Sequence, residues 1–160
     1  MEQGVYEVEA EIEQNHWWFV NRRRLFAKII ADLGLRSSAR VLDVGTSTGT
    51  NLRLVRDLGL SSVMGLDMSL LAARFCKDKG LGSVLVGSAQ AQPFATASFD
   101  LVLATDIIEH LDDDLGGLRE IERVLTPGGW VLLTVPAFPS LWSPHDEAAH
   151  HKRRYLLDSL

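Results

Sequence analysis

The sequence predicts an α/β domain with a doubly wound, mostly parallel sheet and helices on both of its faces. From residue 40 onward, short apolar segments typical of strands alternate with amphipathic segments typical of helices. This alternation implies right-handed crossovers between parallel strands. Phe99 to Ala104 is continuously apolar after Asp100, as expected of a strand that is buried on both faces.

The individual elements can be assigned in chain order. Helices are predicted over Glu7–Phe19 and over the apolar stripe from Leu25 to Leu33. Strands are predicted at Arg40–Val44, Ser62–Leu66, Ser83–Val86, Phe99–Ala104 and Trp130–Val135. Further helices are expected over Asn51–Leu58, after the N-cap residue Ser69 and from Asp112 to Leu125, with a turn at Thr126–Gly129. We divide the chain into an N-terminal helical cap, residues 1–36, and a main domain, residues 37–160.

Composition narrows the class of protein. The 160 residues, 46% of them hydrophobic and 23% charged, are ordinary for one globular fold. The net charge of −5 argues against a nucleic-acid partner, and the apolar runs are too short for a transmembrane segment. The acidic start does not resemble a signal peptide, and the single cysteine, Cys76, suits a reducing compartment. We therefore expect a cytoplasmic protein with Cys76 buried and inert.

The turn after the first predicted strand, Asp43 to Gly49, is the main candidate ligand site, because open α/β sheets bind ligands at the carboxyl ends of their strands. Gly45 allows close approach of a ligand to the backbone, and Gly49 allows the next helix to pack closely. Asp67, at the end of the second strand, can accept hydrogen bonds from a ribose.

The spacing of these residues indicates which nucleoside is bound. No lysine follows Gly49, as a phosphate-binding P-loop requires, and the middle and last glycines of a dinucleotide site are missing. An acidic residue two positions before the first glycine suits an ammonium group better than a pyrophosphate. A phosphate-free cofactor with a ribose, an adenine and an amino-acid end fits best.

Four motifs in this order resemble class I S-adenosylmethionine-dependent methyltransferases, with their Rossmann-like fold. They are Asp43–Gly49, Gly65–Ser69, Phe94–Leu111 and Leu125–Gly129. The segments His16–Phe19 and Val135–Tyr155 further resemble a bacterial subgroup similar to methyltransferase-domain types 11 and 23. The resemblance implies that S-adenosyl-L-methionine is the cofactor, bound by Asp43, Gly45, Thr46, Gly49, Asp67, Met68, Ser88, Ala89 and Thr105.

Within that set, the resemblance implies individual roles. Asp43 and the Gly45 backbone would hold the methionine end, and Asp67 the ribose. Met68 would pack on the adenine face, with Ser88 and Ala89 at its edge. Thr105 and Asp106 would border the methyl group.

The chain departs from the family pattern at several places. Ser47 stands where most members have glycine, Thr46 replaces a common cysteine or other small residue, and Ser88 replaces an acidic residue. The family fold also continues into an antiparallel strand pair, so we expect a chain truncated at its C-terminal end with that pair missing.

The loop after the fifth strand carries the candidate catalytic residues. One hypothesis makes His145 a general base oriented by Asp146; the alternative is a polar substrate loop without a base. A metal site formed by His145, Asp146, His150 and His151 matches no standard zinc pattern, so no metal is expected. Glu109 and His110 could reach the site, although a structural role is expected for His110. The cluster His16–Phe19 is either a lid over the substrate or part of the core.

These observations favour a methyltransferase that acts on a small-molecule acceptor. Arg22–Arg24 and Lys152–Arg154 are expected to be solvated, but together they could hold an anionic or lipid-linked acceptor. A homodimer is a further expectation. The alternatives are an inactive cofactor-binding module and, less favoured, a nicotinamide-dependent oxidoreductase.

Overall fold

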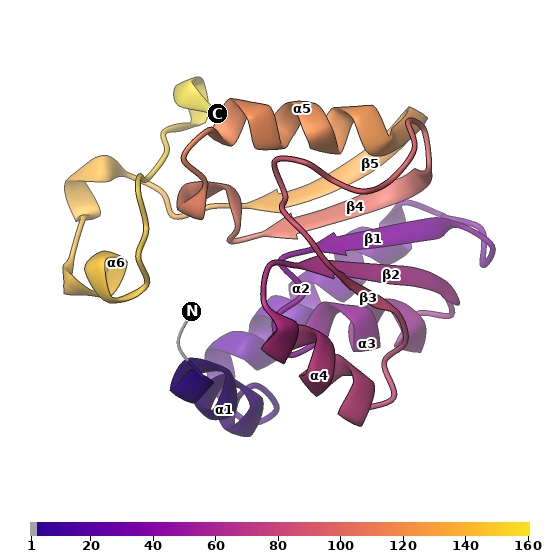
Figure 1. Cartoon of the computed structure of the whole chain (residues 1–160), viewed down its shortest axis with the longest axis horizontal. Coiled ribbons are helices and arrows are strands. Elements are labelled where there is room, and N and C mark those ends of the chain that lie inside the picture. Colours follow the sequence, from indigo (N-terminus) through magenta and orange to yellow (C-terminus); the bar gives the residue numbers. More distant parts are fainter. Residues whose placement is uncertain (1–2) are drawn as a thin grey trace.

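The computed structural model describes residues 3–160 of the chain, with the side chains of residues 3–5 and 9 outside the description. Five parallel strands form one sheet in the order β3-β2-β1-β4-β5 (Figure 1). Their bounds are Arg40–Val44 for β1, Ser62–Asp67 for β2, Val84–Val86 for β3, Phe99–Thr105 for β4 and Leu125–Thr134 for β5. The order reverses between β1 and β4, so the predicted doubly wound α/β fold is confirmed.

Helices cover both faces of the sheet. In Figure 1, α5 (Asp114–Val124) lies on one side, and α2 (Trp17–Asp32), α3 (Thr50–Asp57) and α4 (Leu70–Asp78) lie on the other. Alternate residues of one strand serve the two cores, because successive side chains of a strand point to opposite faces. Leu42 packs in the cluster that includes Val124 of α5, whereas Val41 packs with Ile30 of α2.

The predicted N-terminal helix is wrong in its bounds, because the chain turns between two helices there. α1 spans Gln3–Ile12, and α2 begins at Trp17 after the N-cap position His16. The turn places the Glu13 side chain in the interior, 4% exposed, where Thr50 and Lys79 donate hydrogen bonds to it. A helix continuing to Phe19 would not allow these contacts.

The expected turn at Thr126–Gly129 is part of β5, where it forms a bulge. Phe99 of β4 pairs with Leu125, but Leu101 pairs with Trp130, so extra residues of β5 loop out between these pairs. Gly128 has a φ of +78°, a conformation that L side chains rarely adopt. Proline and glycine therefore bend the strand locally instead of preceding it.

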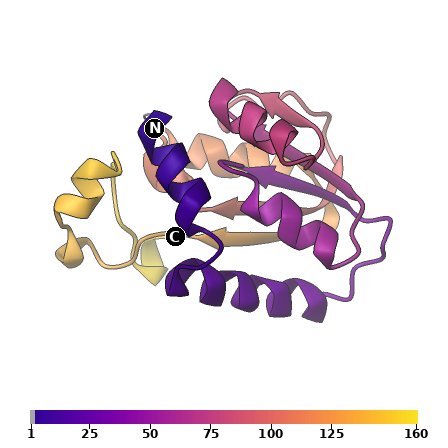
Figure 2. The same ribbon diagram turned by 90° about the horizontal axis from the view of Figure 1, so that it is seen from below.

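The segment after β5 forms an arm beyond the carboxyl ends of the strands. It contains the short helices η2 (Pro139–Leu141), α6 (Pro144–Ala148) and η3 (Leu157–Ser159). Figure 2 shows α1 and α6 on the side to which the strands point. Among residues 3–160, no helix is both long enough and apolar enough to span a bilayer, and no antiparallel strand pair joins the sheet.

Candidate functional site

The turn between β1 and α3 has the backbone conformation that its glycines suggest. Gly45 and Gly49 have φ values of +77° and +87°, and the Gly45 N–H donates to the carbonyl of Leu66 at 2.8 Å. A Cβ on Gly49 would lie 2.5 Å from Leu81 Cδ1 and 2.9 Å from Cys76 Sγ. Gly49 therefore packs closely against α4 and Leu81, and its role in the packing of the next helix, α3, stays a prediction. The predicted burial of Cys76 is confirmed, and it raises the pKa of this thiol to about 12.

Asp43 is the most unusual residue of this turn. Its side chain is fully buried; Oδ1 accepts a hydrogen bond from Asn51 Nδ2 at 3.0 Å, but Oδ2 has no partner within residues 3–160. Burial raises the pKa of Asp43 to about 7, partly opposed by Asn51, and the charge of Asp67 raises it further. A buried oxygen without a hydrogen-bond partner destabilises the folded state unless a ligand supplies the missing hydrogen bond.

Asn51 links two of the predicted site residues and was itself missed. Its amide donates to Asp43 Oδ1 and also to Thr105 Oγ1 at 3.0 Å, so it joins the carboxyl ends of β1 and β4. The sequence signal was an amide side chain two positions after Gly49, which has no specific meaning until the fold brings Thr105 beside it.

Asp67 lies at the end of β2, next to the same turn. Its two oxygens accept backbone hydrogen bonds from Ser47 at 2.9 Å and from Ser69 at 2.8 Å. Each carboxylate oxygen can accept a second bond, so Asp67 is held in place and can still receive ribose hydroxyls. Met68 beside it is 73% exposed, which is unusual for methionine and suits a residue that covers a planar ligand.

Ser88 and Ala89 follow β3, where the Gly87 N–H donates to the carbonyl of Asp67 at 2.9 Å. The Ser88 hydroxyl accepts from the N–H of Gln90 at 3.1 Å, and Ala89 is buried in the core. The turn thus lies beside Asp67, and contact of Ser88 and Ala89 with an adenine edge stays a prediction.

A ligand-sized space lies beside the ends of β4 and β5. This cavity of about 340 Å³ is lined by Trp17, Trp18, Asn21, Arg22, Leu25, Phe26, Asp106 and Thr134. Arg22 lies over the Trp18 ring and forms a 2.7 Å ion pair with Asp106. Trp17 and Trp18 are 68% and 41% exposed, so the core-packing alternative for these tryptophans is wrong. The lid hypothesis for His16–Phe19 stays a prediction.

The expected pairing of Asp146 with His145 is wrong. Asp146 is fully buried and accepts hydrogen bonds from Ser143 N at 2.8 Å and from both Nε and Nη2 of Arg154 at 2.8 Å, and its Oδ1 lies 2.9 Å from His151 Nδ1. The Arg154 guanidinium holds the pKa of Asp146 well below its usual range. His145 is exposed on α6, and its role as a base stays a prediction.

The basic run in the arm forms ion pairs with acidic groups of the protein. Lys152 pairs with Asp112, Arg153 with Asp114, and Arg154 with Asp146. Lys152 is exposed, as expected, whereas Arg153 and Arg154 are half-buried, and the binding of an anionic acceptor by this run stays a prediction. The pairs of Lys152 and Arg153 fasten the arm to the start of α5, and the pair of Arg154 with Asp146 lies within the arm.

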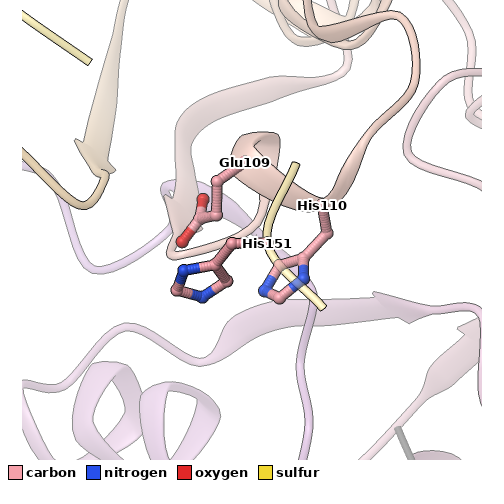
Figure 3. A group of neighbouring side chains, drawn as sticks. All are labelled: Glu109, His110 and His151. Atoms are coloured by element: carbon pink, nitrogen blue, oxygen red, sulfur yellow. The ribbon is translucent and has the colours of Figure 1, made fainter. Parts of the chain in front are cut away.

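One cluster of titratable side chains lies where the arm meets η1 (Ile108–His110) (Figure 3). Glu109 is fully buried, and neither of its carboxylate oxygens hydrogen-bonds to another described residue. Burial raises the pKa of Glu109 to about 8 and lowers that of His110. The His110 and His151 ring centroids are 4.9 Å apart.

Comparisons with known proteins agree with this geometry. Residues 42–133 match the family described as methyltransferase domain. The chain is 33% identical over 148 residues to a malonyl-acyl-carrier-protein O-methyltransferase of Enterobacter lignolyticus, with 86% of this chain and 59% of that protein covered. It is 33% identical over 135 residues to the chloroplastic 2-methyl-6-phytyl-1,4-hydroquinone methyltransferase of Spinacia oleracea, covering 82% and 38%.

A solved structure, the (4+2)-cyclase SpnF, is similar with a TM-score of 0.64 and 26% identity over 74% of this chain and 47% of that chain. The chain therefore spans less than two thirds of these proteins. It belongs to the methyltransferase-domain family, within the class I S-adenosylmethionine-dependent methyltransferases.

Proposed function

We propose that this chain binds S-adenosyl-L-methionine at the carboxyl ends of β1, β2 and β4 and supports methyl transfer to a small-molecule acceptor. The observation that carries the proposal is the unpartnered, buried Oδ2 of Asp43. An ammonium group would neutralise this carboxylate and complete its hydrogen bonding. When bound, the cofactor supplies a methyl group on a sulfonium sulfur.

The chain's own residues mainly bind and orient. Asp43 would hold the amino-acid end, with Asn51 keeping the carboxylate in place. Asp67 would hold the ribose, and Met68 would cover the adenine. Thr46, the Gly45 backbone and Gly49 shape the turn, while Ser88, Ala89 and Thr105 border it. Methyl transfer needs alignment and exclusion of water more than it needs acid–base chemistry.

The binding step is tested by calorimetric titration of the folded chain with S-adenosylmethionine and, separately, with NADH. We expect a micromolar dissociation constant for the first and no binding of the second. Binding of NADH alone would overturn the proposal. Binding of S-adenosylmethionine without methyl transfer to any acceptor would support the inactive-module alternative, which the likeness to a cyclase favours.

We further propose that the acceptor is apolar and contains a ring. The cavity beside Asp106 is lined by Trp17, Trp18, Leu25 and Phe26, and the Arg22 charge is already paired with Asp106. An anionic acceptor would have to compete with that ion pair. Among the relatives, a hydroquinone is a better match to this lining than a malonyl thioester is.

Methyl transfer to a dihydroxybenzene quinol and to a malonyl thioester, measured side by side, tests the acceptor class. Turnover with the quinol is expected, and Trp18→Ala should raise its KM with little change in S-adenosylmethionine affinity. Turnover with the thioester alone would contradict the acceptor class and leave the cofactor proposal intact. Leu157→Ala, a highly exposed apolar side chain outside the cavity, is the matched control.

A further inference from the structure

Glu109 carries a buried carboxylate that the proposed methyl transfer does not use. The side chain has no exposed surface, and neither oxygen bonds to another residue within the described chain. A buried carboxylate in this state is rare, because nothing compensates for its lost hydration. Figure 3 shows it directed toward the imidazole of His151, with His110 beside that ring.

The three side chains come from two segments that are fastened to each other. Glu109 and His110 belong to η1, and the N–H of Lys152 donates to the Glu109 carbonyl at 2.8 Å, which fixes His151 next to η1. One ligand atom from each of Glu109, His110 and His151 lies within 4.8 Å of the others. A tetrahedral zinc shell with bonds of about 2.0–2.2 Å needs ligand atoms roughly 3.3–3.5 Å apart, so modest rotation of the side chains would close the site.

His151 also has the outer partner that is typical of a metal-binding histidine. Asp146 engages Nδ1 of His151 at 2.9 Å, which leaves Nε2 as the nitrogen that can accept a metal ion. The His110 ring packs edge-on against the His151 ring, with the two centroids 4.9 Å apart. The Asp146 contact fixes the orientation of the His151 ring, and in metal proteins such contacts strengthen the ligand.

We propose that Glu109, His110 and His151 form a binding site for a divalent first-row transition ion such as Zn²⁺. Two imidazoles and one carboxylate suit this class of ion, whereas Mg²⁺ and Ca²⁺ prefer oxygen ligands. Three protein ligands leave at least one coordination position for water or for an oxygen of another molecule. The set differs from the one considered in the sequence, since His145, Asp146 and His150 supply no ligand. The proposal does not depend on methyl transfer.

The test is calorimetric titration of chelator-treated, folded protein with Zn²⁺ and with Mg²⁺, followed by metal analysis after dialysis. We expect one Zn²⁺ per chain, no binding of Mg²⁺, and a visible absorption band when Co²⁺ replaces Zn²⁺. Glu109→Gln and His110→Asn should each weaken Zn²⁺ binding by at least about 100-fold. His145→Ala, an exposed histidine of the neighbouring α6, is the matched control and should bind as the wild type does.

The outcomes separate clearly. Loss of Zn²⁺ binding in His145→Ala with retention in Glu109→Gln would overturn the proposal, as would wild-type affinity in both η1 variants. Absence of stoichiometric Zn²⁺ in the wild type would also overturn it. Because His110→Asn and Glu109→Gln alter different ligands, a folding defect in one still leaves the other to decide.

Discussion

Asp43 and Asp146 are two fully buried carboxylates with opposite surroundings. Asp146, in the arm, uses both oxygens in bonds with Arg154 and also contacts Ser143 and His151. Asp43, in the turn after β1, has one side-chain partner at Oδ1 and none among the described residues at Oδ2. A buried charge with its own counterion holds structure together, whereas one without a counterion is the place for a ligand.

The largest effect is expected from Asp146→Asn. The substitution leaves the Arg154 guanidinium without its counterion and releases His151, so the arm loses the contacts that hold α6 against residues 151–154. Breaking one side of a buried pair is strongly destabilising, and we expect the Tm to fall by more than about 5 °C. Asp158→Asn, an exposed carboxylate of η3, is the control. A Tm within about 1 °C of the wild type would contradict a structural role for Asp146.

For Asp43 we expect an effect of pH on the free energy of unfolding. Its pKa of about 7 in the folded protein exceeds its usual value of 3.8, so the folded chain keeps a proton that the unfolded chain has lost between these pH values. This group therefore makes stability fall as pH rises from 4 to 7, and its contribution levels off above 7.

Binding of the cofactor should show the reverse trend. An ammonium group pairs with the ionised carboxylate, so S-adenosylmethionine affinity should rise by up to about tenfold per pH unit below 7 and flatten above it. Titrations between pH 5.5 and 8.5 would measure this. Asp43→Asn should remove the slope and weaken binding, without the loss of Tm seen for Asp146→Asn. A slope unchanged in Asp43→Asn would assign the titration to another group.

The smallest effect is expected from Ser47→Gly, which returns the turn to the pattern of most family members. Ser47 has a φ of +48°, where a side chain costs about 1–2 kcal/mol, and glycine loses about 0.5–1 kcal/mol through its more flexible unfolded state. We expect a net gain of up to about 1 kcal/mol in denaturant unfolding. Ala97→Gly, at a φ of +56° away from this turn, is the matched control. A loss larger than about 1 kcal/mol would contradict the strain argument.

The strands were predictable because their signals are local. The apolar runs and the glycine and polar turns after them located all five strands to within a few residues, apart from the N-terminal extension of β5. Ser69 was correctly predicted as an N-cap, since its side chain accepts from the Leu71 N–H at 3.2 Å. The break between α1 and α2 was missed because the buried contacts of Glu13 with Thr50 and Lys79 reach far along the chain.

The sequence by itself determined the fold class, the turn from Asp43 to Gly49 and the acidic residue Asp67, because each depends on spacing within a short segment. Tertiary structure alone decided the partners. In the folded chain, Asn51 donates a hydrogen bond to Thr105. Asp146 contacts His151 and Arg154 instead of pairing with His145. His151 lies beside Glu109 and His110. Contacts between side chains far apart in the sequence arise because several loops meet at one edge of the sheet. A pattern within a short segment does not show which loops will meet there.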